Sequence, residues 1–159
     1  AMQPVAHPFE VVVTTNSGYP LDQNLYQSVK GMRAAQSVTA KGGSIICAAE
    51  CREGLPDHGS FSELLRSKSS PEALLAMINE PDFGVPDQWQ VQVQALVQTH
   101  ASVYLKSAGL SATQLADSHL LAADDVSETI ERRLSEAGEG ARLCVLPQGP
   151  QTIPYLSAN

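Results

Sequence analysis

The chain has 159 residues, of which 43% are apolar and 17% charged, with a net charge of −7. This length fits one domain with a sizeable core, and no apolar run approaches the roughly 20 residues of a membrane span. The acidic balance leaves no basic stripe for nucleic acid. Three cysteines and no secretion-type leader indicate reduced thiols in the cytoplasm.

The first eight residues form a lead-in to the domain. Pro4 and Pro8 oppose helix formation, so residues 1–8 are expected to be an extended linker or tag remnant. Residues 9–13 form a short apolar, β-branched run, which is typical of strands covered on both faces in a parallel sheet. This run predicts the first, central strand.

A turn and a long helix are predicted to follow this strand. Gly18 can adopt the positive φ of a turn, and Pro20 suits the first turn of a helix. We therefore expect a helix from about Pro20 to about residue 40. Gly42 and Gly43 would end it before a second strand over residues 44–49, which completes a βαβ unit.

The rest of the chain alternates loops, helices and apolar strands. A polar loop over residues 50–59 follows the second strand, at the edge where open parallel sheets bind ligands. The expected helices cover 61–67, 71–80, 88–98, 111–117 and 126–137, and the expected strands cover 101–106, 119–122 and 142–146. Residues 151–159 form a tail.

This alternation of strands and helices over residues 9–150 predicts one α/β domain. Its fold class is a three-layer α/β/α sandwich with a mostly parallel, five-stranded, Rossmann-like sheet. Numbering the predicted strands along the chain, we expect the order 3-2-1-4-5 with right-handed crossovers.

The first helix has two different faces. At about 100° per residue, an apolar side contains Leu21, Leu25, Val29 and Met32, and a polar side contains Gln23, Tyr26, Gln27 and Lys30. A tyrosine hydroxyl and a lysine ammonium one turn apart, beside the free N–H groups of a helix start, suit a carboxylate or phosphate. Such a ligand surface would turn Tyr26 and Lys30 toward the carboxyl ends of the first two strands. A solvated helix face is the alternative.

Other constellations point to no metal site and no catalytic histidine. Cys47 and Cys51 straddle a strand end instead of forming a metal knuckle, and buried free cysteine is common. No two of the four histidines have the i, i+4 spacing of a zinc helix, and His58 in the polar loop is the best placed of them. Glycine patterns for dinucleotide or P-loop binding are absent.

Trp89 is the only tryptophan, and two readings of it stay open. It is predicted to share a core-facing side of its helix with Val93, Leu96 and Val97, while the glutamines look outward. A role at a binding surface is the alternative.

Four stretches together resemble one protein family. The run Gly18–Met32 resembles the signature of the C-terminal domain of the lactate racemase family, which uses a nickel-pincer nucleotide. The other three stretches are Ala49–Cys51 with Gly54 and Phe61, then Val85–Gln90, and finally Val145–Thr152. Because these stretches span almost the whole chain, the resemblance is specific to the domain.

The resemblance implies a division of labour between two domains around a cleft. In this family the N-terminal domain holds the cofactor on a lysine and carries the metal-binding and proton-shuttling histidines. The C-terminal domain lends substrate-binding residues, which match Tyr26, Gln27, Lys30 and Trp89 here. The expected partners are therefore an N-terminal racemase domain and a small 2-hydroxy acid, and this chain itself is expected to hold no catalytic residue, metal or cofactor.

Two functional hypotheses follow. By resemblance, the chain is the substrate-clamping domain of a 2-hydroxy acid racemase or epimerase, an isomerase, with no turnover when isolated. The complete enzyme would remove a hydride from the hydroxyl-bearing carbon, store it on the cofactor, and return it to either face of the planar keto acid. The alternative is a free-standing small-anion-binding or assembly module without catalysis, which requires Met2 to be a true start.

Overall fold

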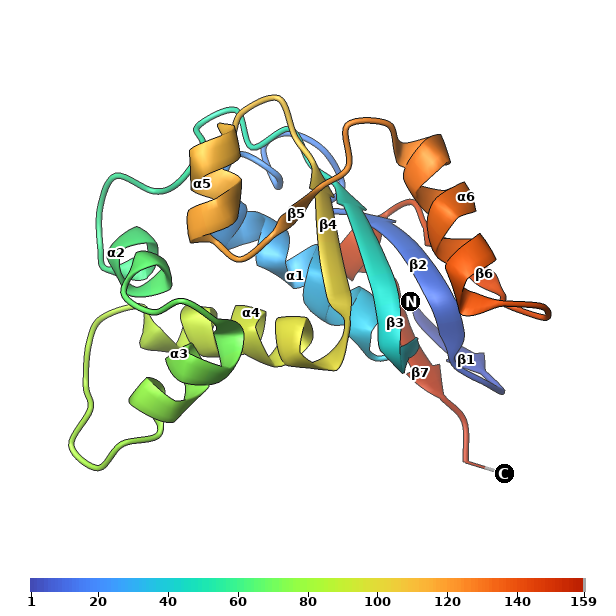
Figure 1. Cartoon of the computed structure of the whole chain (residues 1–159), viewed down its shortest axis with the longest axis horizontal. Coiled ribbons are helices and arrows are strands. Elements are labelled where there is room, and N and C mark those ends of the chain that lie inside the picture. Colours follow the sequence, from blue (N-terminus) through green and yellow to red (C-terminus); the bar gives the residue numbers. More distant parts are fainter. Residues whose placement is uncertain (159) are drawn as a thin grey trace.

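The computed structural model describes residues 1–158, and a five-stranded sheet forms its centre (Figure 1). The strands lie in the order β5-β4-β3-β2-β6, and every neighbouring pair is parallel. Their bounds are Phe9–Thr15 for β2, Thr39–Ala48 for β3, Ser102–Lys106 for β4, Leu121–Ala122 for β5 and Leu143–Leu146 for β6. The predicted five-stranded parallel sheet is confirmed.

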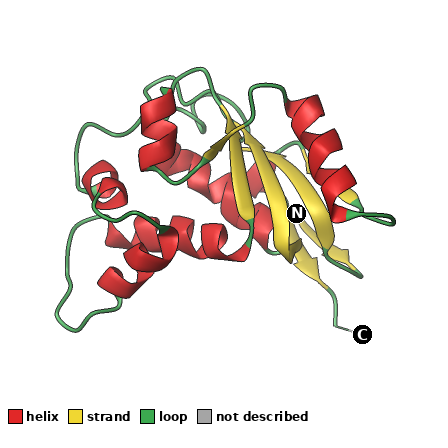
Figure 2. Cartoon of the chain, in the orientation of Figure 1, coloured by secondary structure: helices red, strands yellow, loops and turns green. Residues whose placement is uncertain are grey.

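Helices cover both faces of this sheet, as Figure 2 shows by colour. One face packs against α6 (Val126–Ala137), and the other packs against α1 (Leu25–Gln36) and α4 (Gln88–His100). The short helices are α2 (Phe61–Arg66), α3 (Pro71–Ile78) and α5 (Ala112–Asp117). The three-layer α/β/α architecture is therefore also confirmed. Within residues 1–158, no helix combines the length and apolar character that a membrane crossing requires.

Two cores lie on opposite sides of the sheet because successive strand residues face opposite ways. Val12 and Ile45 point into the larger core, which α1 and α4 close. Their neighbours Val11 and Ile46 point into the smaller core beneath α6. The β-branched runs of the sequence are thus covered on both faces, as central parallel strands require.

The strand order differs from the prediction. Numbered along the chain, the main-sheet strands lie in the order 4-3-2-1-5 instead of 3-2-1-4-5. β5 pairs with β4, because the connection through the short α5 places the next strand in the adjacent position. The longer connection through α6 then crosses the sheet and places β6 beside β2.

The first helix begins later than predicted, at Leu25 instead of near Pro20. The side-chain oxygen of Asn24 accepts a hydrogen bond from the Gln27 N–H, 3.0 Å away, and so caps the helix. Residues 18–22 form a turn, in which the N–H of Asp22 donates to the Gly18 carbonyl. Leu21 is consequently exposed, whereas the other three predicted apolar residues, Leu25, Val29 and Met32, are buried.

The second strand begins earlier than predicted, at Thr39 instead of residue 44. Gly42 and Gly43 therefore lie inside β3 and do not end the helix. The pairing register of β2 and β3 shifts between Phe9 and Val11, which is the mark of a bulge. Gly42 has a φ of 79°, a conformation that glycine accommodates without strain.

A second sheet joins the two ends of the described chain. β1 (Met2–Val5) pairs in parallel with β7 (Ile153–Leu156), which follows the short 3₁₀ helix η1 (Gly149–Gln151). The Ser37 hydroxyl donates to the Pro154 carbonyl over 2.8 Å and attaches β7 to the end of α1. The extended lead-in and the tail expected from the sequence therefore lie along each other.

Candidate functional site

The four side chains singled out from the sequence form one continuous surface across α1 and α4. The Lys30 ammonium donates a hydrogen bond to Gln27 Oε1 over 2.7 Å. The ring of Tyr26 meets the ring of Trp89 edge to face, with centroids 5.9 Å apart. Lys30 and Trp89 are exposed, while Tyr26 and Gln27 are half-buried. An aromatic side chain, an amide and a cation are thus presented together on the exterior.

The rotation of α4 explains why Trp89 is available at this surface. Trp89 is 55% exposed, so the expectation that it faces the core is wrong. Two glutamines are buried in its place: Gln90 donates to the Tyr26 carbonyl, and Gln94 donates to the Ser118 carbonyl. The hydrogen bond of each amide nitrogen offsets part of the cost of burial, although Oε1 of Gln94 is buried without a partner among the described residues. The predicted outward orientation is therefore wrong for Gln90 and Gln94, whereas Gln88 and Gln92 are partly exposed.

A cavity of about 190 Å³, here called the Asp87 cavity, adjoins this surface. Its lining residues are Gln23, Asn24, Tyr26, Gln27, Pro56, His58 and Asp87. Asp87 precedes α4 with a φ of 67°, and its Oδ2 accepts the Ser60 N–H over 3.2 Å. This bond holds the polar loop against the start of α4. Sequence reasoning did not single out Asp87, because no pattern joins it to a helix some 60 residues earlier.

The protonation of Tyr26 suits hydrogen-bond donation. Burial, and then the nearby Asp87 carboxylate, raise the pKa of the Tyr26 phenol above its ordinary value. The phenol therefore keeps its proton at neutral pH. Together with the Lys30 ammonium, the surface offers two donors suited to a carboxylate or another small anion.

A larger cavity of about 580 Å³ lies at the carboxyl ends of β2, β3 and β4. Neither Tyr26 nor Lys30 lines it, so the expected orientation of these two residues toward this edge is wrong. Asp22 does line it; this residue is 5% exposed, and its Oδ2 accepts the Glu50 N–H over 2.9 Å. The bond joins the turn before α1 to the loop after β3. The candidate surface on α1 is thus separate from the sheet-edge cavity.

The three cysteines are at least partly buried, and two of the four histidines, His100 and His119, contact backbone carbonyls. Burial raises the pKa of Cys47, Cys51 and Cys144 and so disfavours their thiolate forms. Nε2 of His100 and of His119 lie within hydrogen-bonding distance of backbone carbonyls, those of Thr39 and Leu65. Among residues 1–158, no three His, Cys, Asp or Glu side chains come together in a way that could hold a metal ion.

The fold and this surface define a parallel α/β domain that presents a tyrosine, an amide, a lysine and a tryptophan together on its exterior. The chain belongs to the lactate racemase C-terminal domain family, which matches residues 5–153. The resemblance inferred from the four sequence stretches is therefore confirmed.

Two lactate racemases are similar to the chain over most of its length. The enzyme of Lactiplantibacillus plantarum is 35% identical over 141 residues, which are 88% of this chain and 33% of that protein. The enzyme of Thermoanaerobacterium thermosaccharolyticum is 33% identical over 149 residues, covering 93% and 35%. The chain thus spans about a third of the length of these relatives.

Solved structures agree with this relationship. The lactate racemase apoprotein from Thermoanaerobacterium thermosaccharolyticum superposes with a TM-score of 0.84 at 32% identity, over 94% of this chain and 36% of that chain. A protein from Thermotoga maritima superposes with a TM-score of 0.56 at 15% identity, over 98% and 39%, which shows a shared fold.

Proposed function

We propose that this chain is the substrate-clamping C-terminal domain of a nickel-pincer nucleotide-dependent 2-hydroxy acid racemase or epimerase, inactive when isolated. The observation that carries this proposal is the surface on which the exposed Lys30 and Trp89 lie beside the half-buried Tyr26 and Gln27. These side chains lie on the outer side of a helix layer, so a small acid bound there needs a second wall to enclose it. In the proposal, an N-terminal domain supplies that wall.

Each residue of the surface has a defined task in the proposal. The Lys30 ammonium and the Tyr26 hydroxyl hold the substrate carboxylate. Gln27, whose Oε1 accepts a hydrogen bond from Lys30, holds the ammonium over the helix face that also carries Tyr26. Trp89 covers the bound acid from the side and excludes water from it.

The nickel-pincer nucleotide is assigned to the N-terminal domain. The surface of this chain suits contact with an anionic group but not nickel ligation, because residues 1–158 gather no three metal-binding side chains. When bound in the complete enzyme, the cofactor supplies the acceptor for the hydride that leaves the hydroxyl-bearing carbon.

Activity of the isolated chain tests the assignment of chemistry to the other domain. We expect no change of optical rotation when the purified 159-residue chain is incubated with lactate. Addition of the N-terminal domain loaded with cofactor should start racemisation. Racemisation by the purified chain alone would contradict this part of the proposal.

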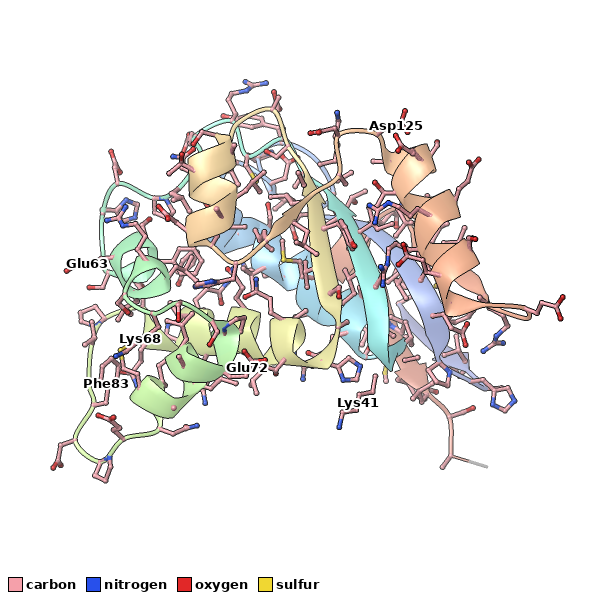
Figure 3. All side chains as sticks on the ribbon, in the orientation of Figure 1. Lys41, Glu63, Lys68, Glu72, Phe83 and Asp125 are labelled. Atoms are coloured by element: carbon pink, nitrogen blue, oxygen red, sulfur yellow. The ribbon has the colours of Figure 1, made fainter. Side chains whose placement is uncertain are left out.

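A substitution of Lys30 tests the clamp itself. A charge-assisted hydrogen bond contributes about 1.5–3 kcal/mol, so Lys30→Ala should weaken binding of the 2-hydroxy acid roughly ten- to hundredfold in the complete enzyme. Because Lys30 is exposed, the thermal midpoint should scarcely change. Lys41→Ala is the matched control, since this exposed lysine lies near the amino end of β3 (Figure 3). If Lys30→Ala and Lys41→Ala bind the 2-hydroxy acid with equal affinity, Lys30 belongs to an ordinary solvated helix face and not to a substrate clamp.

A further inference from the structure

The Asp87 cavity begins where the proposed substrate surface ends. Tyr26 and Gln27 belong to both, and the Lys30 ammonium lies 2.7 Å from Gln27 Oε1. A substrate carboxylate that is bound by Lys30 and Tyr26 would therefore lie next to the opening of the Asp87 cavity. Whatever substituent the 2-hydroxy acid carries on its second carbon must lie within a few bonds of that carboxylate.

Three polar side-chain atoms of the residues that line the Asp87 cavity are available to a ligand. The Tyr26 hydroxyl, His58 Nε2 and Asp87 Oδ1 have no hydrogen-bond partner among the described residues 1–158. Asp87 is held by its other oxygen to the Ser60 N–H, whereas the His58 side chain is 85% exposed and has its Nδ1 3.2 Å from Oδ1 of the likewise exposed Asp57. The cavity thus offers a ligand the O–H donor of Tyr26 and the anchored carboxylate of Asp87, with the exposed His58 imidazole beside them.

Resting on the proposed function, we infer that the Asp87 cavity receives the side chain of the 2-hydroxy acid and selects a side chain that carries a hydroxyl group. A hydroxyl can accept from the Tyr26 hydroxyl and at the same time donate to Asp87 Oδ1 or to His58 Nε2. An alkyl side chain would remove water from these polar groups without replacing its hydrogen bonds. A second carboxylate would meet the negative charge of Asp87.

A neighbouring groove offers an alternative place for the substrate side chain. This groove of about 300 Å³ lies on the other side of Lys30, where Pro150, Ile153 and Pro154 contribute apolar walls. A substrate side chain placed there would favour alkyl groups. Of the four assigned residues, however, the groove contacts only Lys30, whereas the Asp87 cavity contacts Tyr26 and Gln27. This sharing favours the polar cavity.

Substrate preference in the complete enzyme tests the inference. We expect kcat/KM for glycerate to exceed that for lactate about ten- to hundredfold, with malate the poorest of the three. Asp87→Asn keeps an oxygen for the Ser60 N–H but removes the charge, so it should lower the glycerate-to-lactate ratio and improve malate. His58→Ala, at an exposed side chain, should also lower the ratio. A wild-type preference for lactate, or a ratio unchanged in both active variants, would overturn the inference.

The matched control is Glu63→Gln, which removes the same charge outside the Asp87 cavity. Glu63 is exposed on α2 (Figure 3) and should leave the ratio as it is in the wild type. If the glycerate-to-lactate ratio falls as much in Glu63→Gln as in Asp87→Asn, the effect is due to net charge and the role of Asp87 is overturned.

A binding measurement separates this inference from the proposed function. When glycerate is titrated into the 159-residue chain, the His58 ring signals in NMR spectra should shift, those of His7 should not, and lactate should have less effect. If glycerate shifts the His58 signals but the complete protein racemises none of the three acids, the proposed racemase function is contradicted and the inferred cavity is not. Absence of both shifts and racemisation would overturn the inference as well.

Discussion

The side-chain amide of Gln90 donates a hydrogen bond to the backbone carbonyl of Tyr26, with the nitrogen and oxygen 2.5 Å apart. The bond ties α4 to the first turn of α1, and it places Trp89, the preceding residue, against the Tyr26 ring. Gln90 is 2% exposed, so water does not compete for the bond. A buried polar contact therefore sets the geometry of the exposed surface.

Substitutions of Gln90 should reveal this dependence. Gln90→Leu removes the donor at similar volume and should lower the free energy of unfolding by about 1–3 kcal/mol, because a buried partner loses its hydrogen bond. Gln90→Glu should cost more at neutral pH, since a buried carboxylate would face the carbonyl. Urea unfolding at pH 7 measures both. A Gln90→Glu variant as stable as the wild type would contradict the buried contact.

Two aromatic neighbours of Tyr26 should respond differently to truncation. The Phe61 ring lies 5.2 Å from the Tyr26 ring between centroids and is fully buried, so Phe61→Ala should cost about 3–5 kcal/mol of stability. Trp89 is more than half exposed, so Trp89→Ala should cost less than about 1.5 kcal/mol. Thermal and urea unfolding distinguish them. Similar losses in both variants would mean that Trp89 belongs to the core.

Two glycines should tolerate no side chain because α1 and η1 approach the end of β2 closely. An added Cβ at Gly31 or at Gly149 would collide with the Thr15 carbonyl oxygen. Gly31→Ala and Gly149→Ala should therefore each lower stability by about 1–3 kcal/mol, which urea unfolding would measure.

Gly84→Ala is the control for these two variants. Gly84 lies in a loop with open space around its Cα, so this change should be neutral or slightly stabilising. If all three alanine variants unfold at the same denaturant concentration as the wild type, the close approach is absent.

The sequence predicted the parts of the fold that depend on local patterns. The α6 bounds agree with the prediction residue for residue, because Asp125 and Gly138 flank an amphipathic run. The strand order was wrong, because apolar runs identify strands but not their neighbours. The start of α1 was wrong because Pro20 favours a turn as well as a helix start, and the Asn24 cap decides between them.

The candidate site was only partly predictable for a related reason. A helical wheel places Tyr26 and Lys30 on one polar face, but it does not say what lies opposite that face. The burial of Gln90 and Gln94 depends on backbone carbonyls contributed by distant segments. A helical-periodicity argument places polar glutamines on the solvent side of α4. It therefore predicted that Trp89 faces the core, whereas Trp89 is exposed.

The buried thiol of Cys47 makes stability depend on pH in the alkaline range. Burial first, and then the nearby Cys51 thiol and Asp22 carboxylate, raise the pKa of Cys47 far above its ordinary value. In the unfolded chain this thiol ionises near pH 8.5, roughly, whereas the folded chain keeps it protonated. The unfolded state therefore binds fewer protons above this pH, so stability is fully present below it and falls as pH rises further.

The slope of this loss can be assigned by substitution. One thiol contributes up to about 1.4 kcal/mol per pH unit above its unfolded pKa. Cys47→Ala leaves a small cavity and should lower stability near neutral pH, but its stability should fall less steeply between about pH 8.5 and 10. Urea unfolding across this range gives both slopes. Since the pKa values of Cys51 and Cys144 are also raised, part of the slope should remain. Parallel curves for the variant and the wild type would show that Cys47 ionises in the folded protein as readily as in the unfolded chain.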